Sequence, residues 1–211
     1  MKTDAIISAL VADQRRAARP MGVSIALATT LGALISIGLL SATIGVRPDL
    51  VAALASWRFG LKLAIVAMAL GLALADCIRT SSPLADGFAS RWNMLLPALV
   101  AVAIAAELIL TPQPAWTSSL IGSNALLCCV AIPALAVAPL VAGILAMQRG
   151  APASPLVAGV AVGRLAAATA GAMYALHCID DSPLFVATWY ALAMLPVIAI
   201  GAVSGRVMLR W

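Results

Sequence analysis

The sequence has few charged residues for its length. Only 10% of its 211 residues are Asp, Glu, Lys or Arg, whereas 64% are hydrophobic and the mean hydropathy is +1.08. A soluble domain carries about 25% charged residues, which it needs to cover a surface that faces water. The shortage excludes an ordinary soluble domain and predicts an all-α, polytopic membrane protein.

Histidine and cysteine are also scarce, and no C-x-x-C spacing occurs. The chain has one histidine, His177, and four cysteines, Cys77, Cys128, Cys129 and Cys178. Without a C-x-x-C pair the sequence lacks a standard zinc site. A membrane thiol-disulfide oxidoreductase, which needs two reactive cysteines close together, is also disfavoured. Four cysteines in so apolar a chain do not indicate the disulfide framework of a small secreted domain either.

Long apolar runs make up most of the chain. Each is long enough to cross about 30 Å of hydrocarbon as a helix that rises about 1.5 Å per residue. They predict a bundle of six transmembrane helices over residues 21–211, with no room for a soluble domain. The runs are roughly 21–46, 59–76, 94–111, 121–147, 155–176 and 184–205.

The basic residues predict the orientation of these six helices, because cytoplasmic segments carry an excess of Lys and Arg. With the N-terminus inside, three basic residues fall in outer segments: Arg47, Arg58 and Lys62. Nine fall inside, which predicts a multi-pass protein with both termini in the cytoplasm. The nine are Lys2, Arg15, Arg16, Arg19, Arg79, Arg91, Arg149, Arg206 and Arg210.

Residues 1–20 form a polar segment ahead of the first span. Four of its apolar residues have the spacing of one helix face, and two acidic residues accompany them. A helix this short is marginal in water, so we expect it to order against a protein partner or membrane lipid. The candidate partner-binding residues are Asp4, Ile6, Ile7, Leu10, Val11 and Asp13.

Four charged residues, Lys62, Asp76, Glu107 and Arg164, lie inside the apolar runs. Lys62 and Glu107 both fall near the outer face, so we expect them to form an ion pair, because an unpaired charge at that depth is costly. Arg164 is expected to reach toward Asp76 at the cytoplasmic side. A small transporter would need several polar groups along one path, and these residues are too few and too scattered for that.

Small residues and prolines mark two of the predicted contacts between helices. Glycine and alanine recur every four positions in the fifth span and again in the sixth, which favours close helix packing. In the fourth span, Pro133 and Pro139 cannot donate hydrogen bonds to the carbonyls of Cys129 and Leu135. We expect a bend there, beneath the cysteines. The small residues are Gly159, Gly163, Ala167, Gly171, Gly201 and Gly205.

The fourth and fifth spans are expected to form an antiparallel hairpin. The depth of each cysteine in the membrane can then be counted from the inner loop that joins them. Counted from Ala151 in the inner loop, Cys128 is 23 residues back and Cys178 is 27 residues forward. The two depths then differ by only about 6 Å. Cys128 and Cys178 can therefore meet, whereas Cys129 points about 100° away and Cys77 lies at the opposite face.

The chemistry of this pair is open from the residues alone. Two thiols could form a disulfide, or bind a thiophilic heavy-metal ion transiently with support from nearby polar groups. They could also be small buried side chains, and the histidine could be a hydrogen-bonding loop residue rather than a ligand. The supporting residues are His177, Asp180, Asp181 and Cys129.

Several segments together resemble the NrsF family of bacterial inner-membrane anti-sigma factors, and the resemblance spans essentially the whole chain. Tyr174-Ala175-Leu176-His177-Cys178 is its most specific part. The others are Met1-Lys2-Thr3-Asp4 with Ile7, Leu10 and Asp13, Cys128 to Pro133, Arg149-Gly150-Ala151-Pro152, Asp181-Ser182, and Phe185 through Trp189-Tyr190.

The resemblance implies a cytoplasmic N-terminal segment that holds an extracytoplasmic-function (ECF) sigma factor. It also implies two periplasmic-side cysteines, here Cys128 and Cys178, that respond to heavy metal or oxidant. Cys129 is an addition to a single-cysteine pattern, so either neighbour could be the active thiol. Residues 1–20 lack the zinc-binding residues of soluble zinc-containing anti-sigma domains, so an amphipathic helix or an extended strip is expected to bind the partner.

The sequence therefore predicts a regulator rather than an enzyme. Residues 1–20 are expected to bind the ECF sigma factor, and residues 21–211 to form a transmembrane sensor domain. We expect no cofactor and no direct contact with nucleic acid. The alternatives are a membrane thiol-disulfide oxidoreductase and a small transporter.

Overall fold

A computed structural model of the chain describes Thr3 and residues 20–84 and 91–210. The sigma-factor-binding residues predicted from sequence lie outside these described residues. They are Asp4, Ile6, Ile7, Leu10, Val11 and Asp13.

The described residues form helices and no strand, and six helical stretches are long and apolar enough to cross a membrane. This confirms the all-α prediction and the number of spans. The principal helices are α2 (Met21–Thr43), α4 (Trp57–Thr80), α5 (Leu95–Leu110), α7 (Ala125–Met147), α8 (Pro155–Tyr174) and α10 (Ala191–Met208).

Short elements extend or join these helices. The third span begins with η1 (Arg91–Met94), and the fourth with η2 (Gln113–Ala115) and α6 (Trp116–Ile121). The sixth begins with α9 (Pro183–Phe185) and a π-helical turn, η3 (Val186–Tyr190). A further short helix, α3 (Leu50–Ala53), lies between α2 and α4.

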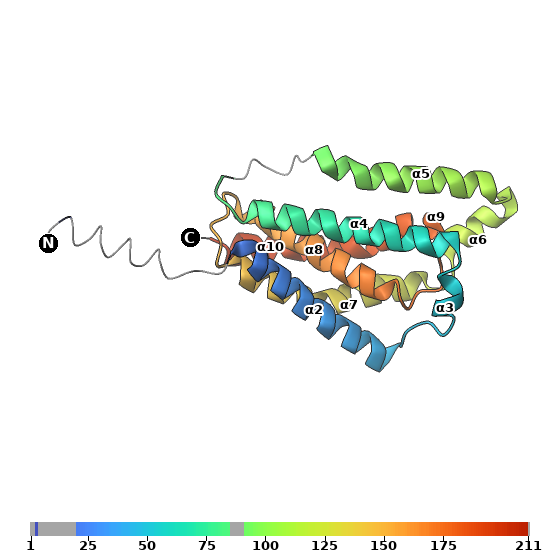
Figure 1. Ribbon diagram of the computed structural model, residues 1–211, viewed down its shortest axis with the longest axis horizontal. Helices are drawn as coiled ribbons and strands as arrows, with labels where there is room; N and C mark the ends of the chain where they lie inside the picture. Colours follow the sequence, from blue (N-terminus) through green and yellow to red (C-terminus); the bar gives the residue numbers. More distant parts are fainter. Residues whose placement is uncertain (1–2, 4–19, 85–90, 211) are drawn as a thin grey trace.

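The bundle has two distinct ends (Figure 1). The start of α2 and the end of α10 lie together at one end, which we call the terminal end. The short helices α3, α6 and α9 lie at the other, which we call the loop end. The polar residues that the sequence singled out around Cys178 belong to the loop end.

Helix α8 is the central helix of the bundle, because its small residues let its neighbours approach closely. It packs against α10, α7, α4 and α2, and 67% of its most apolar stretch is buried. A Cβ atom built on Gly159 would lie 2.4 Å from the carbonyl oxygen of Gly201 on α10. One built on Gly205 would lie 2.5 Å from the Cα of Gly159. The predicted packing role of the small residues is confirmed.

Helix α5 lies at the edge of the bundle, beside α4 (Figure 1). Only 11% of the apolar stretch of its span is buried, so most of its side chains face outward. An apolar helix surface of this kind suits the lipid interior of a membrane. Near its C-terminal end, however, Glu107 is completely buried and links α5 to the loop end.

The buried side chains fall into two clusters, one toward each end of the bundle. The cluster that contains Cys128 and Cys178 also contains Tyr174 and Tyr190, so we call it the cysteine cluster. The second contains Cys77, together with residues from the terminal halves of α2, α7 and α8. Cys77 therefore lies apart from Cys128 and Cys178, as the depth count predicts.

An ion pair forms near the terminal end, as the sequence predicts. The Arg164 Nη1 atom on α8 lies 2.7 Å from the Asp76 Oδ2 atom on α4. Arg79 also contacts this carboxylate, and Asn93 donates a hydrogen bond to it. The buried charge of Asp76 is thus held by three partners, and this network links α4 to α8 and to η1.

Candidate functional site

The segment Ala175–Ser182, which joins α8 to α9, is the centre of the site, and we call it the Cys178 loop. It lies against the turn that follows α2. The Arg47 amide donates to the Leu176 carbonyl at 3.1 Å, and the His177 Nδ1 atom donates to the Gly45 carbonyl at 2.8 Å. His177 is therefore a hydrogen-bonding loop residue, which is one of the two alternatives that the sequence allowed.

Two buried cations also hold the Cys178 loop. The Lys62 ammonium lies 2.6 Å from the Cys178 carbonyl oxygen and 2.8 Å from Asp181 Oδ1. The Arg47 guanidinium lies 2.8 Å from Asp181 Oδ2 and also contacts Asp49. Lys62 is 1% exposed and Arg47 is 7% exposed, so the single carboxylate of Asp181 faces two buried cations, and Asp49 supplies a second negative charge for Arg47.

The structure corrects the predicted ion pair between Lys62 and Glu107. Lys62 points into the bundle toward the Cys178 loop, where Asp181 is its partner. Glu107 pairs instead with Arg58, which lies one turn nearer the start of α4 and whose Nε atom is 3.0 Å away. Ser182 also donates to Glu107 at 3.2 Å. The peripheral α5 meets α4 at the level of Arg58, so the deeper Lys62 pairs with the loop.

Asp180 fixes the start of α7, the helix that carries Cys128. Its carboxylate accepts hydrogen bonds from the backbone amides of Ser123 and Asn124 and from both of their side chains. The first amides of a helix have no partners within the helix, so this carboxylate acts as a cap supplied by another segment. Gly122 has a φ of +58°, and a Cβ atom there would lie 2.7 Å from Asp180 Cγ.

Replacing Asp180 with alanine should loosen the start of α7. We expect a loss of about 1–2 kcal/mol of stability, the upper range for a helix cap. Because Cys128 lies in the first turn of α7, its alkylation by N-ethylmaleimide should also become faster. Asp180→Asn keeps one acceptor oxygen and should give a smaller change in both measurements. Unchanged unfolding and unchanged alkylation in Asp180→Ala would show that this cap does not hold the site.

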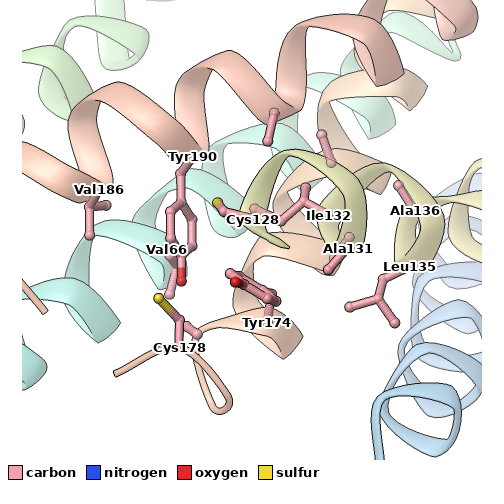
Figure 2. Close-up of a cluster of buried hydrophobic side chains, with 14 of the residues drawn as sticks. Val66, Cys128, Ala131, Ile132, Leu135, Ala136, Tyr174, Cys178, Val186 and Tyr190 are labelled. Carbon is pink, nitrogen blue, oxygen red and sulfur yellow. The ribbon is translucent and has the colours of Figure 1, made fainter. Parts of the chain in front are cut away.

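Cys128 and Cys178 come from different segments but share the cysteine cluster. Both thiols are free, and both residues are fully buried. Figure 2 shows both sulfur atoms directed into one interior region, with the hydroxyl ends of Tyr174 and Tyr190 pointing into it as well. The two tyrosine rings are 5.8 Å apart. The pair therefore lies in a dry, largely apolar environment beside two phenols.

The hydroxyl groups of Tyr174 and Tyr190 have little hydrogen bonding for buried polar groups. Among the described residues, neither the Tyr174 nor the Tyr190 hydroxyl has a hydrogen bond of standard geometry. The Cys178 sulfur is a polar neighbour of both hydroxyls. The Cys178 thiol itself is directed at the Asp180 carbonyl oxygen, 3.8 Å away. Within the part of the chain that the structure describes, the two tyrosine hydroxyls therefore have only the lone pairs of the Cys178 sulfur to donate to. A thiol sulfur is a weak hydrogen-bond acceptor.

The electrostatics of Cys178 favour a resting thiol. Burial raises the pKa of the Cys178 thiol above its ordinary value, while the nearby Lys62 ammonium opposes this rise. The first effect is the larger, because removing water penalises the charged thiolate. Cys178 is therefore protonated at neutral pH and becomes a better nucleophile when its surroundings open.

The other predicted supporting residues are engaged away from the two sulfur atoms. Asp180 caps α7, Asp181 pairs with the two cations, and His177 bonds to the turn after α2. Cys129 is half-buried, whereas Cys128 is fully buried. In the part of the chain that the structure describes, no group of three or more His, Cys, Asp or Glu side chains could hold a metal ion. The Cys128 and Cys178 thiols share one buried cluster.

Sequence reasoning missed several residues of this site. Arg47 was counted only as an outer basic residue, yet it holds Asp181, and Arg58 holds Glu107. Their positions near the outer ends of neighbouring segments could have indicated ion pairing. Tyr174 and Tyr190 carried no signal of this kind, because burial and missing hydrogen bonds are properties of the folded chain.

Comparisons with known proteins cover the whole chain. A family model described as "NrsF: Negative regulator of sigma F" matches residues 10–211. The probable anti-sigma-F factor NrsF of Azospira oryzae is 34% identical over 100% of both chains, and the anti-sigma-F factor NrsF of Caulobacter vibrioides is 33% identical over 100% of both. No solved structure matches the chain. The chain belongs to the NrsF family of negative regulators of sigma F, which are regulatory rather than catalytic proteins.

Proposed function

We propose that this protein is an inner-membrane anti-sigma factor that releases an ECF sigma factor when Cys128 and Cys178 react with a heavy metal or an oxidant. The observation that carries the proposal is that two cysteines from separate segments are both free and buried in one cluster. Family membership and the full-length similarity to two anti-sigma-F factors support the regulatory part of the proposal.

Two reactions of the pair fit this arrangement. An oxidant such as a peroxide or a hypohalous acid takes up two electrons and two protons while one S–S bond forms. A divalent thiophilic cation instead binds two thiolates, and two protons are released to water. Both reactions replace two separate thiols with one linked unit, and both pull the Cys178 loop and the first turn of α7 toward each other.

The partner end of the proposal is the segment of residues 1–20. It precedes α2 directly, and α2 starts at the terminal end of the bundle, away from the cysteine cluster (Figure 1). In the proposed orientation the terminal end is cytoplasmic and the loop end is periplasmic, as the distribution of Lys and Arg predicts. A signal received at the cysteines must then cross the membrane to reach the sigma factor.

The test is co-purification of the sigma factor with membranes before and after exposure to cadmium. The parent protein should lose most of its bound sigma factor after exposure. Cys128→Ser and Cys178→Ser should each hold it at the unexposed level, because one thiol can form neither the disulfide nor the two-sulfur metal site. Cys77→Ser is the matched control, since Cys77 is equally buried but belongs to the other cluster, and it should respond like the parent.

Two further variants separate the parts of the proposal. Cys129→Ser should respond normally if Cys128 is the active neighbour. Deletion of residues 2–18 should abolish co-purification with or without cadmium. Normal release in both Cys128→Ser and Cys178→Ser would rule out the sensor assignment, and binding that survives the deletion would rule out the partner segment.

A further inference from the structure

Helices α2 and α7 run antiparallel in a single register along much of their length. Gly32 on α2 lies against Pro139 on α7, and one turn further along α2 the Ser36 hydroxyl lies 2.7 Å from the Leu135 carbonyl oxygen. The register continues to the terminal end, where the Met21 side chain lies near Gly150, just after α7. The two helices are therefore closely paired from Ser36 to the start of α2.

The hydrogen bond from Ser36 compensates for a defect in α7. Pro139 has no N–H group, so the Leu135 carbonyl lacks the donor that an α-helix normally supplies. In a lipid environment an unsatisfied carbonyl is unfavourable, and a neighbouring helix can satisfy it. The Ser36 oxygen is also 2.8 Å from the Gly32 carbonyl, but that carbonyl already accepts the Ser36 amide within α2. The hydroxyl proton is therefore best used at Leu135.

The glycine opposite the proline makes this bond possible. A Cβ atom on Gly32 would lie 2.5 Å from Pro139 Cα and 2.9 Å from its nitrogen, so the contact is between backbones. Ser36 is 1% exposed, which means that neither water nor lipid can replace its hydrogen bond. We call these four residues, Gly32, Ser36, Leu135 and Pro139, the α2–α7 joint.

The joint lies on a direct path between the two ends of the proposed mechanism. Leu135 belongs to the cysteine cluster, as do Cys128 on the same helix and Leu40, one turn beyond Ser36 on α2. Residues of α2 and α7 also share the second cluster at the terminal end. A movement of α7 that begins at Cys128 would therefore reach Leu135, whose carbonyl has no donor within α7. The Ser36 hydroxyl of α2 donates to that carbonyl, so the movement would act on α2 through this hydrogen bond.

We infer that Ser36 is a positioning residue that transmits the state of the cysteine pair from α7 to α2, and so to the segment that precedes α2. The inference rests on the proposed function, because it assigns the route by which the same cysteines act on the partner segment. Ser36 does this by holding α2 to the α7 carbonyl that Pro139 leaves without a donor within the helix.

The experiment uses the full chain in membranes with cadmium chloride as the probe. It measures the amount of the protein in membranes, the fraction of Cys128 and Cys178 protected from alkylation, and the sigma factor retained before and after exposure. Ser36→Ala removes the donor, and Ser36→Thr keeps it. The matched control is Thr30→Ala, which removes an exposed hydroxyl of α2 that bonds only within its own helix.

In Ser36→Ala the cysteines should react as in the parent, but the ratio of sigma factor retained before and after exposure should fall to about 1. Ser36→Thr and Thr30→Ala should keep the ratio of the parent. If the cysteines of Ser36→Ala react and its ratio of retained sigma factor equals that of the parent, the role of Ser36 is overturned and the proposed function still stands. Release from the parent while both thiols stay free would instead overturn the proposed function.

Hydrogen exchange on the unsubstituted protein in lipid nanodiscs answers the same question if Ser36→Ala does not accumulate. Once the cysteines have reacted, amide protection should change around Ser36 in α2 as well as around Leu135 in α7. A change confined to α7, with α2 protected as before, would overturn the inference.

Discussion

Replacing Asp181 with alanine should destabilise the folded protein by about 3–5 kcal/mol, the cost of removing one partner from a buried ion pair. Asp181 is the carboxylate that Lys62 and Arg47 share, at 2.8 Å from each. Arg47 would keep Asp49 as a partner, but Lys62 would keep only carbonyl oxygens. The Cys178 loop would then face a buried charge that no carboxylate neutralises.

Unfolding of the purified protein in mixed detergent measures this effect. Asp49→Ala is the matched control, because Asp49 also pairs with Arg47 but its side chain is 53% exposed, and a much smaller loss of stability than in Asp181→Ala is expected. The double variant Asp181→Ala with Lys62→Met removes the stranded charge and should recover part of the stability. Equal losses in Asp181→Ala and Asp49→Ala would contradict the importance of the buried network.

A large side chain at Gly159 should separate α8 from α10. Any Cβ atom there would meet backbone atoms, including the Gly201 carbonyl oxygen and the Gly205 Cα. Backbone cannot rotate aside as a flexible side chain can, so Gly159→Leu should cost about 3 kcal/mol, at the upper end for overpacking. Because α8 is the central helix, the cysteine cluster should loosen with it.

The control for this prediction is Gly71→Leu on α4. A Cβ atom at Gly71 has no atom within 4 Å, so the added side chain would extend outward from the bundle. Both variants can be compared by detergent unfolding and by the rate at which N-ethylmaleimide reaches Cys178. We expect Cys178 to be alkylated faster in Gly159→Leu than in the parent protein, and at the same rate as in the parent in Gly71→Leu. A parent rate in both would show that the glycine contacts are dispensable.

The number and extent of the membrane helices could be predicted because each apolar run by itself reaches the length of a span. The close packing of α8 was also predictable, since glycine and alanine recur on one helix face at a fixed spacing. The pairing of Arg164 with Asp76 followed from depth, because both residues lie near the same end of neighbouring helices. Each of these features depends on local sequence or on depth alone.

The partners of Lys62 and Glu107 could not be predicted from depth. Arg58 and Lys62 are one turn apart on the same face of α4, and a count along the sequence does not say which of them lies level with Glu107. In the folded chain Arg58 lies beside Glu107, and Lys62, one turn deeper, lies beside Asp181. Asp180 raised the same difficulty, because a carboxylate beside a cysteine suggests a metal ligand and only the fold reveals it as a helix cap.

The site combines a firmly held backbone with two buried free thiols. Lys62, Arg47 and Asp180 fix the Cys178 loop and the start of α7, so the two thiols are held at a defined separation. The phenols beside them are left with little hydrogen bonding. A charged or metal-bound sulfur would accept more strongly from these hydroxyls than a thiol does. In the proposed mechanism these hydroxyls would therefore stabilise a metal-bound sulfur.

The most direct test of the central proposal is a parallel titration of thiol modification and sigma-factor release. Membranes from cells exposed to increasing cadmium would be alkylated and digested, and the modified fractions of Cys128 and Cys178 compared with the sigma factor still bound. We predict that the two thiols become protected together and that release follows the same dose dependence. Sigma factor that leaves the membrane while both thiols remain free would contradict the proposal.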